Sequence, residues 1–191
     1  DKLIKDGVQG AIFVVGNTIV DATMRYTKKA LESKNKLLHE TSKGQPFILL
    51  TMHREENVDL DKNFSSLIDS LNLIAKEFDK RIIFSTHPRT MNRLKEKGLD
   101  ILDKRIEILK PLGLFDYISL QMNSFCTISD SGTITEESSI LNFPAITIRQ
   151  AHERPEGMDV GTLIMSGLNP ERVVDAIRVV ISQYDSKERV F

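Results

Sequence analysis

The chain has 191 residues, of which 40% are hydrophobic and 28% charged, and its net charge is −1. This composition is typical of a soluble globular protein, and the balanced charge gives no reason to expect a nucleic-acid surface. No apolar run approaches the roughly 20 residues that span a bilayer, and no signal-peptide pattern opens the chain. The single cysteine, Cys126, lies in an apolar run and is expected in the core, which fits a cytoplasmic protein.

Apolar runs alternate with amphipathic segments along the chain. The first half predicts a strand at 11–15, a helix at 21–33, a loop at 34–44, a strand at 47–50, a helix at 64–78 and a strand at 81–84. The apolar residues of the helix at 64–78 recur with a 3.6-residue period, which makes it the best-defined helix. The helix at 21–33 is predicted to place Ala22, Tyr26 and Ala30 on one face.

The second half continues the alternation. It predicts a helix at 90–97 closed by Gly98, a strand at 105–109, a helix at 114–123, a strand at 125–129, a helix at 133–141, strands at 145–148 and 161–165, and a last helix beginning at 169–171. Short, continuous apolar strands that alternate with helices indicate an α/β fold. We expect a Rossmann-like, doubly wound parallel sheet with helices on both faces.

Polar clusters follow five of the predicted strands. They lie at 51–56, 85–89, 110–113, 129–131 and 149–156. Because the carboxyl ends of parallel strands meet at one edge of the sheet, and ligands bind there, these clusters predict a functional site.

The segment 129–138, Ser-Asp-Ser-Gly-Thr-Ile-Thr-Glu-Glu-Ser, is the most informative of these clusters. A turn at Ser131, Gly132 and Thr133 that opens a helix offers N–H groups and hydroxyls to a phosphate. Glu137, one to two turns later, could accept hydrogen bonds from a sugar hydroxyl. The alternative is an ordinary helix start capped by Asp130 or Ser131.

Histidine and arginine side chains offer further chemistry. His53 and Arg54 follow the strand at 47–50 and could neutralise a diphosphate or protonate a leaving oxygen, or His53 could simply cap a helix. His87 occupies the equivalent place after the next strand, where His-Pro can also end a strand. The four histidines lack the ligand spacing of a zinc site, so no metal is expected.

The loop after the strand at 145–148 holds Arg149 and Arg154, which could bind phosphate or pair with the neighbouring glutamates. A phosphate-binding P-loop, a dinucleotide fingerprint and a hydrolase nucleophile elbow are all absent from the sequence.

Together, the motifs resemble those of a known family, the non-hydrolysing UDP-N-acetylglucosamine 2-epimerases. In order, they are Val15-Gly-Asn-Thr18 with Asp21, Thr51-Met-His-Arg-Glu-Glu-Asn57, His87-Pro88, Asp130-Ser-Gly-Thr-Ile-Thr-Glu-Glu137, Phe143-Pro-Ala-Ile146, Glu153-Arg-Pro-Glu156 and Gly161. The resemblance covers nearly the whole chain. The sequences of the two segments 129–137 and 149–156 are similar to those of the family branch that works on related UDP-N-acetyl amino sugars for capsule and O-antigen synthesis.

The resemblance implies a GT-B architecture of two Rossmann-like domains. Residues 1–191 would form the single carboxyl-terminal, UDP-binding domain, with 1–20 including the link from a missing amino-terminal domain. It further implies roles for individual residues. Ser131, Gly132 and Thr133 would bind the diphosphate, and Glu137 would bind the ribose. The 111–115 turn with Phe115 would face the uracil, and Arg154 would lie in the phosphate region. His53 would assist the departure of UDP, while Arg54 and His87 would belong to a regulatory site.

The implied reaction is elimination of UDP from a UDP-N-acetyl amino sugar and its re-addition after inversion at C2, with no cofactor. The family's carboxylates near C2 would lie in the missing domain, so this chain alone is expected to bind UDP weakly and not to epimerise. The implied partners are the UDP-sugar substrate, the missing domain and a second subunit of a homodimer. A GT-B UDP-sugar glycosyltransferase domain and a non-catalytic nucleotide-sugar binding module remain the alternatives.

Overall fold

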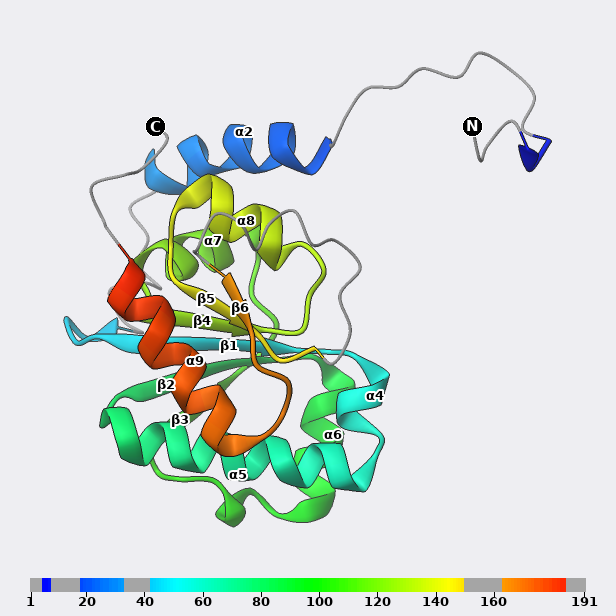
Figure 1. Ribbon diagram of the computed structural model, residues 1–191, viewed down its shortest axis with the longest axis vertical. Helices are drawn as coiled ribbons and strands as arrows, with labels where there is room; N and C mark the ends of the chain where they lie inside the picture. Colours follow the sequence, from blue (N-terminus) through cyan, green and yellow to red (C-terminus); the bar gives the residue numbers. More distant parts are fainter. Residues whose placement is uncertain (1–4, 8–17, 33–41, 150–162, 185–191) are drawn as a thin grey trace.

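A six-stranded parallel sheet forms the centre of the computed structural model, which describes residues 5–7, 18–32, 42–149 and 163–184. The strands lie in the order β3-β2-β1-β4-β5-β6, and every neighbouring pair is parallel (Figure 1). This is the strand order of a Rossmann-like sheet, so the predicted fold class is confirmed.

Strands and helices alternate along the described chain from β1 to β5. The strands are β1 (Phe47–Met52), β2 (Arg81–Thr86), β3 (Ile106–Leu109), β4 (Cys126–Ser129), β5 (Ala145–Thr147) and β6 (Leu163–Met165). The helices are α2 (Thr18–Glu32), α4 (Glu55–Val58), α5 (Asp61–Phe78), α6 (Pro88–Lys97), the 3-10 helix η1 (Leu99–Ile101), α7 (Leu114–Asn123), α8 (Ile134–Leu141) and α9 (Pro170–Gln183). The predicted strand at 11–15 lies outside the described residues.

Helices cover both faces of the sheet. Helices α5, α6 and α9 lie on one face, and α7 and α8 lie on the other (Figure 1). Successive residues of β1 show this division, because Ile48 and Leu50 pack in the core beneath α5 and α9, whereas Phe47 and Leu49 pack with Leu120 of α7. Strands buried on both faces are apolar without alternation, which explains their continuous apolar runs in the sequence.

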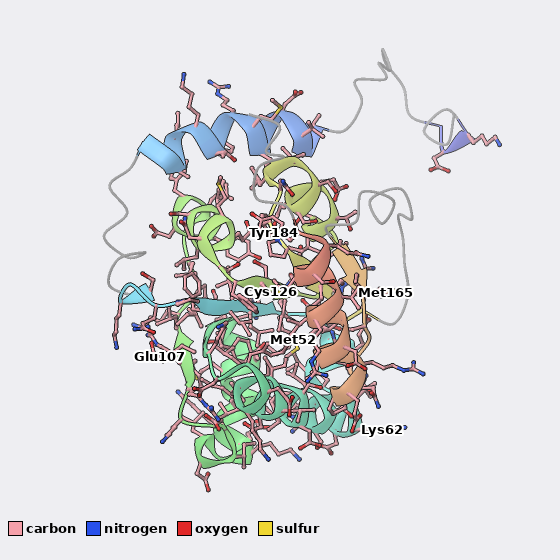
Figure 2. All side chains as sticks on the ribbon, turned by 60° about the vertical axis from the view of Figure 1, so that its left-hand side comes forward. Met52, Lys62, Glu107, Cys126, Met165 and Tyr184 are labelled. Atoms are coloured by element: carbon pink, nitrogen blue, oxygen red, sulfur yellow. The ribbon has the colours of Figure 1, made fainter. Side chains whose placement is uncertain are left out.

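Cys126 begins strand β4 within the sheet, between the helical layers (Figure 2). Its side chain is buried, and burial raises the pKa of its thiol well above the ordinary value. A thiol in this environment is unreactive. The prediction that Cys126 belongs to the core is therefore confirmed.

Helix α2 adds a layer outside α7 and α8 (Figure 1). Its buried face is formed by Thr23, Thr27 and Ala30, while the predicted face residue Ala22 is exposed. Thr27 can be buried because its hydroxyl donates to the backbone carbonyl of Thr23 at 2.7 Å, which leaves its methyl group free to pack.

Local signals set several helix boundaries. Helix α6 begins earlier than predicted, at Pro88, because His87 occupies the N-cap and its Nδ1 accepts from the backbone N–H of Arg89. The helix ends at Lys97 and is followed by Gly98, whose φ of 91° is accessible to glycine. The Asn169 side chain caps α9 in the same way by accepting from the N–H of Arg172.

None of the described helices is long and apolar enough to cross a membrane.

Candidate functional site

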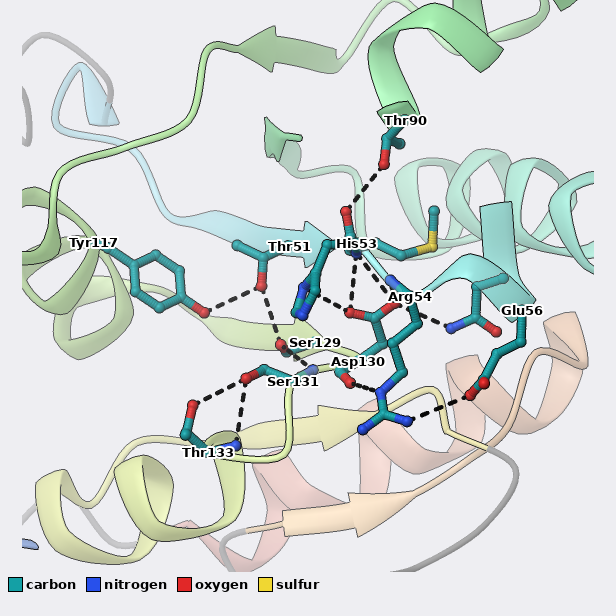
Figure 3. Close-up of polar contacts among 12 residues, drawn as sticks. Thr51, His53, Arg54, Glu56, Thr90, Tyr117, Ser129, Asp130, Ser131 and Thr133 are labelled. Carbon is teal, nitrogen blue, oxygen red and sulfur yellow. Dashed lines mark hydrogen bonds and ion pairs between the residues drawn. The ribbon is translucent and has the colours of Figure 1, made fainter. Parts of the chain in front are cut away.

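The candidate site lies where the chain reverses its direction across the sheet. From β1 the connections lead outward to β2, and from β4 they lead outward the other way to β5, so the adjacent strands β1 and β4 form the topological switch point. Such a crevice at the carboxyl ends of the strands is the usual ligand position in open α/β sheets. The loops at 53–54 and 130–133 flank it (Figure 3).

Asp130, directly after β4, joins these two loops. Its side chain is fully buried and accepts hydrogen bonds from the backbone N–H groups of His53 and Arg54 and from the amide of Asn57, at 2.9–3.2 Å. The backbone carbonyl of Asp130 also accepts from Nε of Arg54 at 2.9 Å. A buried carboxylate requires this number of N–H donors to offset its lost hydration.

Neither Asp130 nor Ser131 occupies the N-cap of α8, although the Ser131 hydroxyl accepts from the backbone N–H of Thr133 at 3.3 Å in the turn before the helix. Thr133 occupies the N-cap position of α8, and it makes no side-chain capping bond. The carboxylate of Asp130 instead reaches the loop after β1.

The imidazole of His53 also contacts Asp130. Its Nδ1 lies 3.2 Å from Oδ1 of the carboxylate, while 53% of the His53 side chain remains exposed. The alternative that His53 caps a helix is wrong, because Arg54 holds the N-cap position of α4. His53 is therefore held on one side and accessible on the other.

A cavity of about 250 Å³ opens beside His53. Ser131 lines it from the loop after β4, and His87 lines it from the loop after β2. The turn after β3 contributes Pro111 and Leu112. The cavity therefore brings together four of the five polar loops that the sequence predicted to meet at one edge.

Side-chain hydroxyl groups of the site form hydrogen bonds with one another (Figure 3). Thr51 Oγ1 lies 3.1 Å from the hydroxyl of Tyr117 and 3.0 Å from Oγ of Ser129, which accepts from the N–H of Ser131 at 3.1 Å. The Ser131 and Thr133 hydroxyls are 2.9 Å apart. The side chain of Thr133 therefore adds a hydrogen bond within the turn.

Glu137 lies on α8, near the hydroxyl group of Tyr117. Its Oε2 accepts from Nε2 of Gln121 at 2.6 Å, and its side chain is half-buried. Burial first, and then the negative charge of Glu137, raise the pKa of the Tyr117 hydroxyl well above the usual value of 10.0. Tyr117 is thus a neutral hydrogen-bonding group in this site at physiological pH.

Arg149 approaches the 131–133 turn from the end of β5. The side chain of Arg149 is buried, and its Nη1 would stand 3.6 Å from a methyl group placed on Gly132. A guanidinium beside a turn at a helix start gives the turn a positive environment suited to an anion.

The structure does not gather every predicted site residue into the cavity. Phe115 does not line it; the ring is 41% exposed and packs edge-on against Tyr26 of α2, 5.9 Å between centroids. Tyr117, two residues later, lines the cavity instead, and sequence reasoning missed it. Arg154 lies outside the described residues.

The two residues predicted for a regulatory site occupy different positions. His87 lines the cavity while capping α6, and Arg54 lies on the far side of Asp130 with Nη1 3.6 Å from Glu56. Within the described ranges, no group of three histidine, cysteine, aspartate or glutamate side chains could hold a metal ion.

A family model described as UDP-N-acetylglucosamine 2-epimerase matches residues 1–190. The chain belongs to this family. The UDP-N-acetylglucosamine 2-epimerase of Methanococcus maripaludis is 38% identical over 187 residues, which cover 95% of this chain and 51% of that protein.

Solved structures of the epimerase family show the same fold. The Methanocaldococcus jannaschii UDP-GlcNAc 2-epimerase, in complex with UDP-GlcNAc and UDP, matches with a TM-score of 0.79 and 39% identity over 94% of this chain and 51% of that one. The UDP-N-acetylglucosamine 2-epimerase from Rickettsia bellii matches with a TM-score of 0.78 and 41% identity, over 98% and 50%.

The chain thus spans about half the length of the epimerases it matches. The described sheet is one Rossmann-like half of a GT-B architecture, as predicted.

Proposed function

We propose that this chain is the UDP-binding half of a non-hydrolysing UDP-N-acetylglucosamine 2-epimerase, and that residues 1–191 form its carboxyl-terminal domain. The observation that supports this most is the cavity at the β1–β4 switch point, which joins His53 to the Ser131 turn. A nucleotide diphosphate needs a cationic or N–H-rich cradle for phosphate and a carboxylate for ribose. Ser131 lines the cavity at the start of the turn, and the charge of Glu137 acts on the hydroxyl of Tyr117, which also lines it.

In this proposal the 131–133 turn and the start of α8 bind the diphosphate, with Arg149 beside them neutralising charge. Glu137 accepts hydrogen bonds from the ribose hydroxyls. The uracil lies toward the turn after β3, where Pro111, Leu112 and Tyr117 line the cavity. Phe115 contributes from the outside of that turn, and Arg154 adds to the phosphate region.

The reaction proceeds by elimination and re-addition. A base from the other half removes the proton on sugar C2, and the C1–O bond breaks with its electron pair leaving on UDP. Re-addition forms a new C1–O bond while a proton is delivered to the opposite face of C2. Interactions that stabilise the departing diphosphate lower the barrier in both directions, and His53 supplies one of them when its ring carries a proton on both nitrogens and donates from Nε2 to a phosphate oxygen.

The wider context is part of the same proposal. The substrate is UDP-N-acetylglucosamine or a related UDP-N-acetyl amino sugar, for surface polysaccharide precursors such as capsule or O-antigen. The full-length enzyme is a cytoplasmic homodimer that needs no cofactor, and Arg54 and His87 belong to a regulatory substrate site.

An assay of a full-length protein carrying this chain as its carboxyl-terminal half tests the activity. With UDP-N-acetylglucosamine alone, we expect its C2 epimer to accumulate to a constant ratio from either direction, with deuterium from the solvent incorporated at C2. This chain alone is expected to give no turnover.

Two other results would contradict the proposal. Sugar transfer that requires an added acceptor would indicate a glycosyltransferase. UDP-sugar binding without turnover by the full-length protein would indicate a binding module.

A further inference from the structure

We propose that Asp130 is a positioning residue that keeps the proton of the neutral His53 imidazole on Nδ1 and leaves Nε2 for the ligand. The role of His53 rests on the proposed function, but its tautomer can be measured without substrate. The two side chains come from loops after different strands, β1 and β4, at the switch point (Figure 3).

The orientation of the Asp130 carboxylate is fixed by groups that can only donate. Oδ2 accepts from the N–H of Arg54 at 2.9 Å, from Nδ2 of Asn57 at 3.1 Å and from the N–H of His53 at 3.2 Å. Backbone and amide N–H groups have no alternative protonation state. The other oxygen, Oδ1, is thereby directed at the His53 ring.

The position of the proton on the His53 ring must therefore match the fixed carboxylate. Nδ1 lies 3.2 Å from Oδ1, and a carboxylate offers only acceptors at this distance. A neutral imidazole has one protonated nitrogen, so the contact is favourable only when that nitrogen is Nδ1. The same oxygen also accepts from the His53 backbone N–H at 3.1 Å, so one group holds both the backbone and the ring.

The unprotonated Nε2 is the nitrogen that remains for the cavity. His53 lines the cavity, and 53% of its side chain is exposed. Nε2 is therefore the ring nitrogen left for a ligand in the cavity that Ser131 also lines.

The test is the tautomer of His53, read by long-range proton–nitrogen NMR of this chain labelled with ¹⁵N-histidine, at a pH where the ring is neutral. The resonance is assigned with a His53→Gln variant. We expect the Nδ1–H form to predominate in the wild type. Predominance of the Nε2–H form would overturn the proposal even if no variant folds.

Asp130→Asn provides the decisive comparison. The amide oxygen should remain at the Oδ2 position, because an amide nitrogen there would face three donors. The amide nitrogen then faces Nδ1 and forces the Nε2–H tautomer. The control Asp59→Asn removes an exposed carboxylate at the end of α4 and should leave the tautomer unchanged. An unchanged tautomer in folded Asp130→Asn would contradict the proposal.

Turnover in the full-length enzyme separates positioning from mere structural support. Asp130→Asn should lower kcat by at least about tenfold while KM stays within about threefold. The neutral amide cannot stabilise the ring with a proton on both nitrogens, which is the form that donates from Nε2 to the leaving oxygen, whereas the groups that bind the substrate are unchanged. A rise in KM with unchanged kcat would contradict the positioning role. Failure of the wild type to bind UDP would instead contradict the proposed function, and the measured tautomer would still stand.

Discussion

Asp130 and His53 are 77 residues apart in the sequence, yet the carboxylate of one accepts from the backbone of the other and lies 3.2 Å from its ring nitrogen. This pair spans the switch point, where β1 and β4 are neighbours with connections that leave in opposite directions. The loop that offers His53 to the cavity is therefore positioned by the residue that precedes the Ser131 turn.

Replacing Asp130 with alanine should destabilise the protein. The change leaves buried N–H groups of His53, Arg54 and Asn57 without their acceptor. We expect the free energy of unfolding to fall by about 2–4 kcal/mol in urea denaturation, given typical costs of unsatisfied buried groups. Asp59→Ala, at an exposed carboxylate, should change it by less than about 0.5 kcal/mol. Equal effects of the two variants would contradict the structural role of Asp130.

Gly132→Ala separates folding from binding. Gly132 does not adopt a positive φ, and a methyl group there would make an ordinary 3.6 Å contact with Arg149. The unfolding free energy should therefore change by less than about 0.5 kcal/mol. The methyl group does occupy the space through which a phosphate reaches the backbone, so UDP affinity should fall at least about tenfold. Unchanged affinity would exclude this turn as the diphosphate site.

Arg149→Ala should weaken binding of UDP more than binding of uridine. The guanidinium lies beside the 131–133 turn, where it can neutralise phosphate but not the nucleoside. We expect UDP affinity to fall by about tenfold or more, which corresponds to one charge-assisted hydrogen bond. The matched control is Arg178→Ala on the exposed face of α9. Equal losses for UDP and uridine would contradict a phosphate role.

The raised pKa of Tyr117 predicts that the free energy of unfolding depends on pH. Because its pKa is raised in the folded protein, the unfolded chain loses this proton first as the pH rises. The stability conferred by the neutral hydroxyl is thus fully present below the unfolded pKa of about 10 and is lost progressively above it. Tyr117→Phe should therefore reduce the alkaline loss of unfolding free energy. Parallel curves for Tyr117→Phe and wild type between pH 9 and 11 would contradict this.

Much of the fold could be predicted because its signals are local. The 3.6-residue period over 64–78 corresponds to α5, and Asn169 followed by Pro170 marks the start of α9. The four-residue helix α4 was not predicted, since one turn is too short to show a period. The predicted face of α2 was right for Ala30, which is buried, and for Tyr26, which packs against the same cluster, but wrong for Ala22, which is exposed.

The site was predicted less completely because its contacts are long-range. The order of strands implied that the polar loops meet, but no local pattern links Asp130 to His53. Tyr117 was missed for a geometric reason. Residues 115 and 117 lie about 200° apart around a helix, so the orientation of α7 decides which aromatic ring reaches the cavity. The domain boundaries and the roles of the site residues stay predictions.

The most direct test of the account is calorimetric titration of this chain with UDP, alongside Glu137→Gln and the control Glu96→Gln. Glu137 lies at the site on α8, whereas Glu96 is an exposed residue of α6 with the same change of charge. The account predicts weak, saturable binding of one UDP by the wild type and by Glu96→Gln, and at least about tenfold weaker binding by Glu137→Gln, since one carboxylate hydrogen bond to ribose is lost. Undiminished binding by Glu137→Gln, or no binding by the folded wild-type chain, would contradict it.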